Sequence, residues 1–305
     1  MRFVRRYLIP RLIQYVLMIS LGLTVIFFLP RLLPTDPIMA QIHLMEGLGA
    51  GIDPVSKEEL IATLREMYGL EEGLFRQYVS FWRRFFTLDF GPSLFMFPTP
   101  VSRLIGRALP WTVGLLLTST LLGWTIGNIL GGLRGYFRQS RLLKIVDGLA
   151  MFFRPIPPYI MALMLIILFA FLLGVLPLSG GYTVGMRVAF TWSFIKDVIR
   201  HAVLPVASLI LLGAAINHQS MRLIVQSVTD EDYVRYAKIG NVKERTIFGR
   251  YVMRNALLPQ VTALSMSLGM LFGGALITEM VFAYPGIGLL AYRAIINSDY
   301  NLIMG

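Results

Sequence analysis

The chain has 305 residues, of which 56% are hydrophobic, with a mean hydropathy of +0.67 and a formal net charge of +11. A soluble protein of this length could not cover so much apolar surface with polar residues, so the composition excludes that class and indicates an integral membrane protein. The chain has no cysteine, which excludes disulfides, thiolate metal sites and a thiol nucleophile. Its positive residues lie at the ends of apolar runs, a pattern that marks membrane topology and argues against nucleic-acid binding.

The first predicted element, residues 1–33, is a cytoplasmic N-terminus followed by a membrane span. An uncharged run from Leu12 to Pro30 is longer than the apolar core of a signal peptide, about 7–15 residues, and no small-x-small cleavage site follows it. The run is therefore predicted to stay in the membrane. Positive residues gather on the cytoplasmic side of membrane proteins, and four precede this run: Arg2, Arg5, Arg6 and Arg11.

Residues 34–107 are predicted to form an extracytoplasmic segment, because they hold nine of the 17 acidic residues and are net acidic beside the basic N-terminus. One short amphipathic helix is predicted after Asp53-Pro54 and a second in the aromatic-rich stretch LFRQYVSFWRRFFTL, which begins at Leu74. The second helix can lie in the lipid interface or pack on the protein, and both interpretations stay open.

Residues 108–305 are predicted to form the transmembrane core. The 26 residues between Arg107 and Arg134 carry no charge and are long enough for a tilted second span. The loop that follows is rich in positive residues, with Asp147 as its only acid, and is predicted to be cytoplasmic. Further spans are predicted at 148–176, 201–221 and 255–282. This makes five spans in the sequence, and a sixth is expected beyond residue 305.

Prolines and small residues predict two local features of these spans. Pro155, Pro157 and Pro158 lie near the start of the third span and must bend or interrupt its helix. The fifth span contains small residues that allow helices to approach closely in lipid: Gly269, Gly273, Gly274 and Ala275.

Two polar residues are candidates for a gate or for the transport pathway. Asn217 belongs to the cluster NHQS, which either lines a path or marks the end of the emerging fourth helix, and we favour the second interpretation. Glu279, near the outer end of the fifth span, is the main ionisable candidate within the spans. It can form a gate, contact substrate or serve in packing.

The polar stretch between the fourth and fifth spans, with its charged part at 229–254, predicts two helices joined by a turn. Thr229 and Asp232 resemble a capping box at the start of the first helix. At about 100° per residue, Tyr233, Tyr236, Ala237 and Gly240 share one face, opposite Arg235 and Lys238. Gly240-Asn241 predicts the turn. The face of tyrosines and small residues suits a groove on a partner protein, while an ordinary basic cytoplasmic hairpin is the alternative.

This stretch resembles a known signature. Asp232-Tyr233-Val234-Arg235 with Ala237, followed by RNALLP at 254–259, is similar to the EAA-type signature of ABC importer permeases of the dipeptide and oligopeptide branch. Four other motifs and Arg222 extend the resemblance over nearly the whole chain: LLPTDP, YGLEEGLFRQYVSF, GVLPLSG and EMVFAYPGIG. Asn241 stands where the family has glycine, and we expect the turn to survive because asparagine accepts the left-handed conformation. Thr35 also replaces a family glycine.

The resemblance implies an all-α, type I ABC importer permease of the first-permease (B-type) kind, with six transmembrane helices. Such a subunit is no enzyme and binds no cofactor or metal; ATP and Mg²⁺ belong to two partner ATPase subunits. None of the lysines follows a glycine, so the chain contains no P-loop motif. Family members also pair with a second, related permease as a heterodimer and receive solute from an extracytoplasmic binding protein, in the inner membrane of a prokaryotic cell.

The resemblance further implies that the first helix of the polar stretch is a coupling helix that contacts the ATPase subunit. The residues expected to make this contact are Asp232, Tyr233, Arg235, Tyr236, Ala237, Lys238, Gly240 and Asn241. Peptides are the expected solute, with oligosaccharides, nickel and glutathione as alternatives within the family. A secondary transporter driven by an ion gradient is the alternative from another class.

Overall fold

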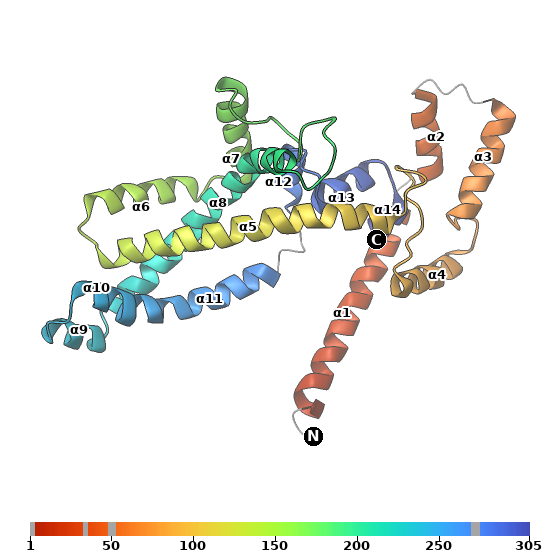
Figure 1. Cartoon of the computed structure of the whole chain (residues 1–305). Helices are drawn as coiled ribbons and strands as arrows, with labels where there is room; N and C mark the ends of the chain where they lie inside the picture. Colours follow the sequence, from red (N-terminus) through yellow and green to blue (C-terminus); the bar gives the residue numbers. More distant parts are fainter. Residues whose placement is uncertain (1–3, 33–35, 48–52, 270–274) are drawn as a thin grey trace. The chain divides into compact units, whose positions relative to one another are not determined.

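The computed structural model describes residues 4–32, 36–47, 53–269 and 275–305 (Figure 1). Over these residues the prediction of an all-α protein is confirmed, since helices dominate and the one β-type pairing is an isolated bridge between Pro92 and Pro100. The chain divides into two compact units. The first comprises residues 1–108 with 290–305, and the second comprises residues 109–289.

The first unit contains one long apolar helix, α1 (Ile9–Phe28), in its described part. Its helices, together with the start of α5 and the end of α13, are α1 (Ile9–Phe28), α2 (Pro37–Gly47), α3 (Pro54–Met67), α4 (Leu74–Thr87) and α14 (Tyr300–Met304). A π-helical turn, η1 (Val4–Leu8), precedes α1, and a 3₁₀ turn, η2 (Pro30–Leu32), follows it. Proline begins α2 and α3, where its fixed φ suits the first helical turn and its missing N–H costs nothing.

The second unit contains the remaining helices. They are α5 (Val101–Tyr136), α6 (Arg141–Phe153), α7 (Pro158–Leu165), η3 (Ile166–Leu172), α8 (Trp192–Thr229), α9 (Asp232–Ile239), α10 (Glu244–Thr246), η4 (Ile247–Met253), α11 (Arg254–Gly269), α12 (Leu276–Val281) and α13 (Ile287–Ile296). The elements η3 and η4 are π-helical. The chain passes between the two units within α5 and α13.

The membrane spans follow the predicted order in part. Three helical stretches in the described part of the chain are long and apolar enough to cross a membrane: Arg6–Leu32, Val101–Tyr136 and Trp192–Thr229. They correspond to the first, second and fourth predicted spans. The third is broken, because Arg141–Phe153 and Pro158–Leu172 pass the same test only together and bend by 111° at the proline-rich break. The predicted interruption by prolines is therefore confirmed.

The fifth predicted span, 255–282, is described only at its two ends, by α11 and α12, and residues 270–274 lie outside the described residues. Two of the small residues expected to permit close helix packing, Gly273 and Gly274, fall in that gap. Gly269 is described, and a Cβ built on it would meet nothing within 4 Å.

Close packing through glycine occurs instead between α5 and α8. Gly123, Gly127, Gly131 and Gly135 recur every four residues and form one stripe along α5. A Cβ on Gly127 would lie 2.6 Å from the carbonyl oxygen of Ala214, and one on Gly135 would lie 2.7 Å from that of Arg222. The backbones of the two helices thus touch directly, as small residues at four-residue spacing allow in membranes.

Candidate functional site

The helix α9 is held by a buried apolar cluster that we call the hairpin core. Its members come from four elements: Met221 and Val225 of α8, Val234 and Ala237 of α9, Ile247 and Val252 of η4, and Ala256 of α11. Because all seven are buried in one cluster, α9 is packed against the C-terminal part of α8 and against the helix that follows it.

The exposed side of α9 differs from the predicted docking face. Ala237 is only 8% exposed and packs in the hairpin core, so the prediction that it lies on an exposed face is wrong. The reason is that α9 turns Val234 and Ala237, three residues apart, toward α8. Tyr236 is 71% exposed and Ile239 is 81% exposed.

The exposed residues of α9 include a set at i, i+3, i+4 and i+7, which we call the α9 outer face: Asp232, Arg235, Tyr236 and Ile239. Lys238 and Gly240 are exposed beside it. Tyr233 is less exposed than Tyr236, and its hydroxyl accepts a hydrogen bond of 3.0 Å from Nδ2 of Asn255. Sequence reasoning missed Ile239, although its position seven residues after Asp232 is the signal that would have included it.

The start of α9 also differs from the prediction. Thr229 is the last residue of α8, and its hydroxyl donates to the carbonyl oxygen of Val225 at 2.6 Å. The predicted capping box of Thr229 and Asp232 is therefore wrong. The N-cap of α9 is Glu231, whose side chain makes no capping hydrogen bond.

The end of α9 forms the predicted turn. Asn241 has a φ of 57°, in the left-handed region, so the expectation that asparagine replaces glycine here is confirmed. The N–H of Val242 donates to the carbonyl oxygen of Ala237 at 3.1 Å, and that of Asn241 donates to Lys238 at 3.1 Å. These two bonds make a Schellman motif, with Val242 packed on the hairpin core as its apolar contact.

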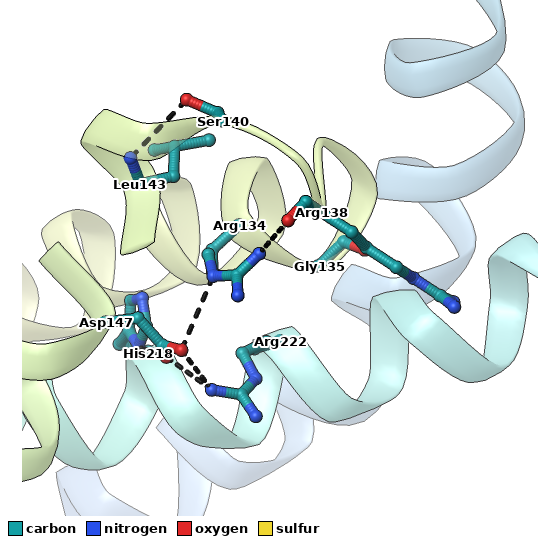
Figure 2. A network of polar contacts seen from close by, with 8 residues as sticks. All are labelled: Arg134, Gly135, Arg138, Ser140, Leu143, Asp147, His218 and Arg222. Carbon is teal, nitrogen blue, oxygen red and sulfur yellow. Dashed lines mark hydrogen bonds and ion pairs between the residues drawn. The ribbon is translucent and has the colours of Figure 1, made fainter. Parts of the chain in front are cut away.

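A polar network centred on Asp147 joins the three helices next to this hairpin (Figure 2). Asp147, on α6, is buried, and both its carboxylate oxygens lie 2.5 Å from Nη1 of Arg222 on α8. Nε of Arg134, on α5, is 3.4 Å from the same carboxylate. Nδ1 of His218 lies 3.9 Å away, and neither ring nitrogen of His218 has a hydrogen-bond partner among the described residues.

The network continues to the hairpin through the end of α5. Nη2 of Arg138 donates to the carbonyl oxygen of Gln226 at 3.2 Å and lies 3.4 Å from the carboxylate of Asp230. The hydroxyl of Tyr136 donates to the carboxylate of Glu244, and Nζ of Lys238 lies 5.5 Å from the centre of the Tyr136 ring. Polar contacts from the end of α5 and the turn after it thus reach Asp230, just before α9, and Glu244, just after it.

Glu279 serves as a cap and a brace in this conformation. It is fully buried, accepts from the Thr112 hydroxyl at 2.6 Å and accepts from the N–H groups of Gly288 and Leu289 at 2.6 and 3.1 Å. The carboxylate therefore satisfies the N-terminus of α13 and ties it to α5. This geometry matches the packing alternative and offers no free oxygen to a substrate.

Asn217 lies inside α8, well before its end at Thr229, so the interpretation that it marks the end of the helix is wrong. Its Nδ2 donates to the carbonyl oxygen of Gly213 at 2.8 Å. A Cβ built on Gly127 would lie 2.7 Å from the Cβ of Asn217, which places this residue at the contact between α5 and α8.

Comparisons with known proteins agree with this architecture. The family model described as binding-protein-dependent transport system inner membrane component matches residues 123–305. The oligopeptide transport system permease protein AppB of Bacillus subtilis is 30% identical over 287 residues, which cover 94% of this chain and 86% of AppB. The oligopeptide transport system permease protein OppB of Haemophilus influenzae is 27% identical over 299 residues, which cover 98% of this chain and 90% of OppB. The chain belongs to the family of binding-protein-dependent transport system inner membrane components, as a multi-pass ABC transporter permease rather than an enzyme.

Proposed function

We propose that this chain is the permease subunit of an ATP-driven importer that takes up peptides. The support is that AppB and OppB are both named for oligopeptide transport and match nearly the whole chain. In this proposal a binding protein outside the membrane delivers the peptide, and the permease pairs with a second, related permease. Two ATPase subunits drive alternating access, with ATP and Mg²⁺ bound on them and the N-terminus of this chain in the cytoplasm of a prokaryotic cell.

The observation that carries the coupling part of the proposal is the two-sided character of α9. Its inner side belongs to the hairpin core, which it shares with α8 and α11. Its outer face presents two exposed apolar side chains, Tyr236 and Ile239, next to the charged residues Asp232 and Arg235. Burying each apolar side chain against a partner contributes roughly 1.5–3 kcal/mol. A partner docked there would move α9 and, through the hairpin core, both helices behind it.

The substitution Tyr236→Glu tests this docking face. We expect the variant to fold normally, because Tyr236 is exposed, but to place an uncompensated carboxylate in the interface with the ATPase subunit. A loss of only 1.4 kcal/mol in docking lowers affinity about tenfold. ATP-driven uptake in proteoliposomes should fall accordingly, while the ATPase subunits keep their own basal hydrolysis.

The matched control is Phe190→Glu, the same type of change at an aromatic residue that is fully exposed in a loop outside the α9 hairpin. We expect it to transport normally. Ala237→Glu would be a poor test, because the new carboxylate would enter the hairpin core and disturb folding. Normal coupled transport by Tyr236→Glu would show that the outer face of α9 does not dock the ATPase subunit.

The solute and the energy source can be tested together. Proteoliposomes are prepared with both permeases, the ATPase subunits and the binding protein. They should transport a labelled tri- or tetrapeptide only when ATP is present on the side of the membrane where the ATPase subunits dock. A labelled oligosaccharide should not enter under the same conditions. Peptide uptake driven by an ion gradient without ATPase subunits would contradict the proposal. The geometry of Glu279 weakens that alternative, since among the described residues its carboxylate oxygens accept from Thr112 and from the start of α13.

A further inference from the structure

The helix α4 carries an apolar stripe that no described part of the chain covers. Phe75, Val79, Trp82 and Phe86 follow one another at i, i+4, i+7 and i+11 and so lie on one side of the helix. Phe75 is 79% exposed and Phe86 is 76% exposed, and the side chain of Val79 between them is exposed as well. Leu88, directly after the helix, extends the same exposed apolar surface.

Another side of α4, which carries Gln77, Tyr78 and Phe81, packs on the last turns of α1. The hydroxyls of Tyr78 and Thr24 are hydrogen-bonded at 2.7 Å, and the rings of Tyr78 and Phe81 lie 5.2 and 5.5 Å from the ring of Phe27. Arg31 donates from Nε and Nη2 to Oε1 of Gln77 at 3.2 and 3.1 Å. The level of α4 along α1 is therefore set by the stretch from Thr24 to Arg31.

That stretch is the end of a membrane span. The segment Arg6–Leu32 is apolar enough to cross a bilayer, and only 6% of its most apolar window is buried within the chain. Because α4 is attached where this exposed apolar span ends, its exposed stripe adds to the apolar surface that the span leaves uncovered. Aromatic residues gather at this level of a membrane, where a ring can bury its apolar body near the headgroups.

The charges of α4 suit the same environment. The helix contains no acidic residue, and Arg76 and Arg83 lie together on the side of the helix next to the apolar stripe. Both are exposed, and neither guanidinium group makes a hydrogen bond or an ion pair with another described residue. An apolar stripe bordered by free cations is the pattern of a helix that lies in the membrane plane and contacts lipid phosphates.

We propose that α4 is an interfacial anchor, with Phe75, Val79 and Phe86 inserted among the acyl chains and with Arg76 and Arg83 bound to phospholipid phosphates. The anchor lies at the membrane face reached by the C-terminal end of α1. This inference goes beyond the proposed function and does not depend on it, since the same geometry would hold α4 in the membrane whatever solute is transported. In this proposal both environments left open for this helix apply, since one side of α4 packs on α1 and another contacts lipid.

The chain contains no cysteine, so an introduced cysteine is the only labelling site that this subunit contributes to the assembled transporter. We would introduce Val79→Cys and Phe86→Cys in the stripe and Thr87→Cys on the polar side, and attach a nitroxide to each. Collision rates with oxygen, which concentrates in the acyl region, and with a water-soluble nickel chelate would then be measured in phospholipid vesicles. We expect the ratio of oxygen to nickel collisions to be several-fold higher at positions 79 and 86 than at 87.

A second comparison tests the arginines. With the label at position 79, the double substitution Arg76→Gln and Arg83→Gln should lower the ratio of oxygen to nickel collisions, because the helix loses its phosphate contacts and rises toward water. Stripe labels as accessible to nickel as position 87 would overturn the proposal, since the stripe would then face water. Immobilised stripe labels that neither reagent reaches would overturn it too, since another protein surface would then cover α4. An unchanged ratio in the double variant would show that Arg76 and Arg83 do not hold α4 at the phospholipid phosphates.

Discussion

Replacing Asp147 by asparagine is expected to lower the free energy of unfolding by about 3 kcal/mol, the usual cost of removing one partner from a buried ion pair. The carboxylate is the shared partner of Arg222 and Arg134, and all three side chains are largely buried. An amide at this position would leave both guanidinium groups without a counter-charge. The midpoint temperature of thermal unfolding in detergent should therefore fall by several degrees.

Asp230→Asn provides the matched control. It removes a carboxylate from another arginine, Arg138, in the same region, but both side chains of that pair are exposed and 3.4 Å apart. Exposed pairs contribute less than about 1 kcal/mol, so the control should unfold close to the wild-type temperature. Equal stability of the two variants would mean that the network around Asp147 does not hold α5, α6 and α8 together.

Replacing Gly131 by alanine is expected to force α5 and α8 apart. The added methyl group would collide with the carbonyl group of His218, and backbone atoms cannot move aside as a flexible side chain can. Overpacking of this kind costs about 1–3 kcal/mol. The loss should appear as a lower unfolding temperature and as a longer distance between spin labels placed on the two helices.

Gly114→Ala makes the same change on the same helix where a Cβ would meet nothing within 4 Å. Because alanine favours helix over glycine by about 1 kcal/mol, this variant should be as stable as the wild type or more stable. The two substitutions are thus expected to change the free energy of unfolding in opposite directions. A Gly131→Ala variant that gains stability like Gly114→Ala would contradict the direct contact between the two backbones.

The predictions about spans succeeded where they depended on one segment at a time. Hydropathy located α1, α5 and α8, because a bilayer requires a long apolar helix whatever its neighbours are. The prolines near residue 155 predicted the 111° break for an equally local reason, since proline cannot complete the hydrogen bonds of a helix interior. The left-handed turn at Asn241 was predictable because it depends on a single residue type.

The faces of helices were less predictable. Helical periodicity placed Tyr236 and Ala237 on one face of α9, but the structure separates them, because the side that turns inward depends on where α8 and η4 lie. Ala237 was therefore expected outside and is buried, while Ile239 was overlooked and is exposed. The glycine repeat in α5 was readable as a four-residue spacing, yet its partner was not, because nothing local to α5 identifies α8 as the helix that it touches.

The sequence alone was enough to establish the class of protein and the positions of its apolar helices. Both follow from the free energy of transferring each segment from water to lipid, which depends only on the side chains of that segment. Which side chains pair with one another does not follow from that free energy. Glu279 meets Thr112 across 167 residues and Asp147 meets Arg222 across 75, and only the packed chain brings these groups together. A hydrogen bond or an ion pair forms over about 3 Å, so which charges pair and which side of α9 stays free are decided by the positions of residues distant in the sequence.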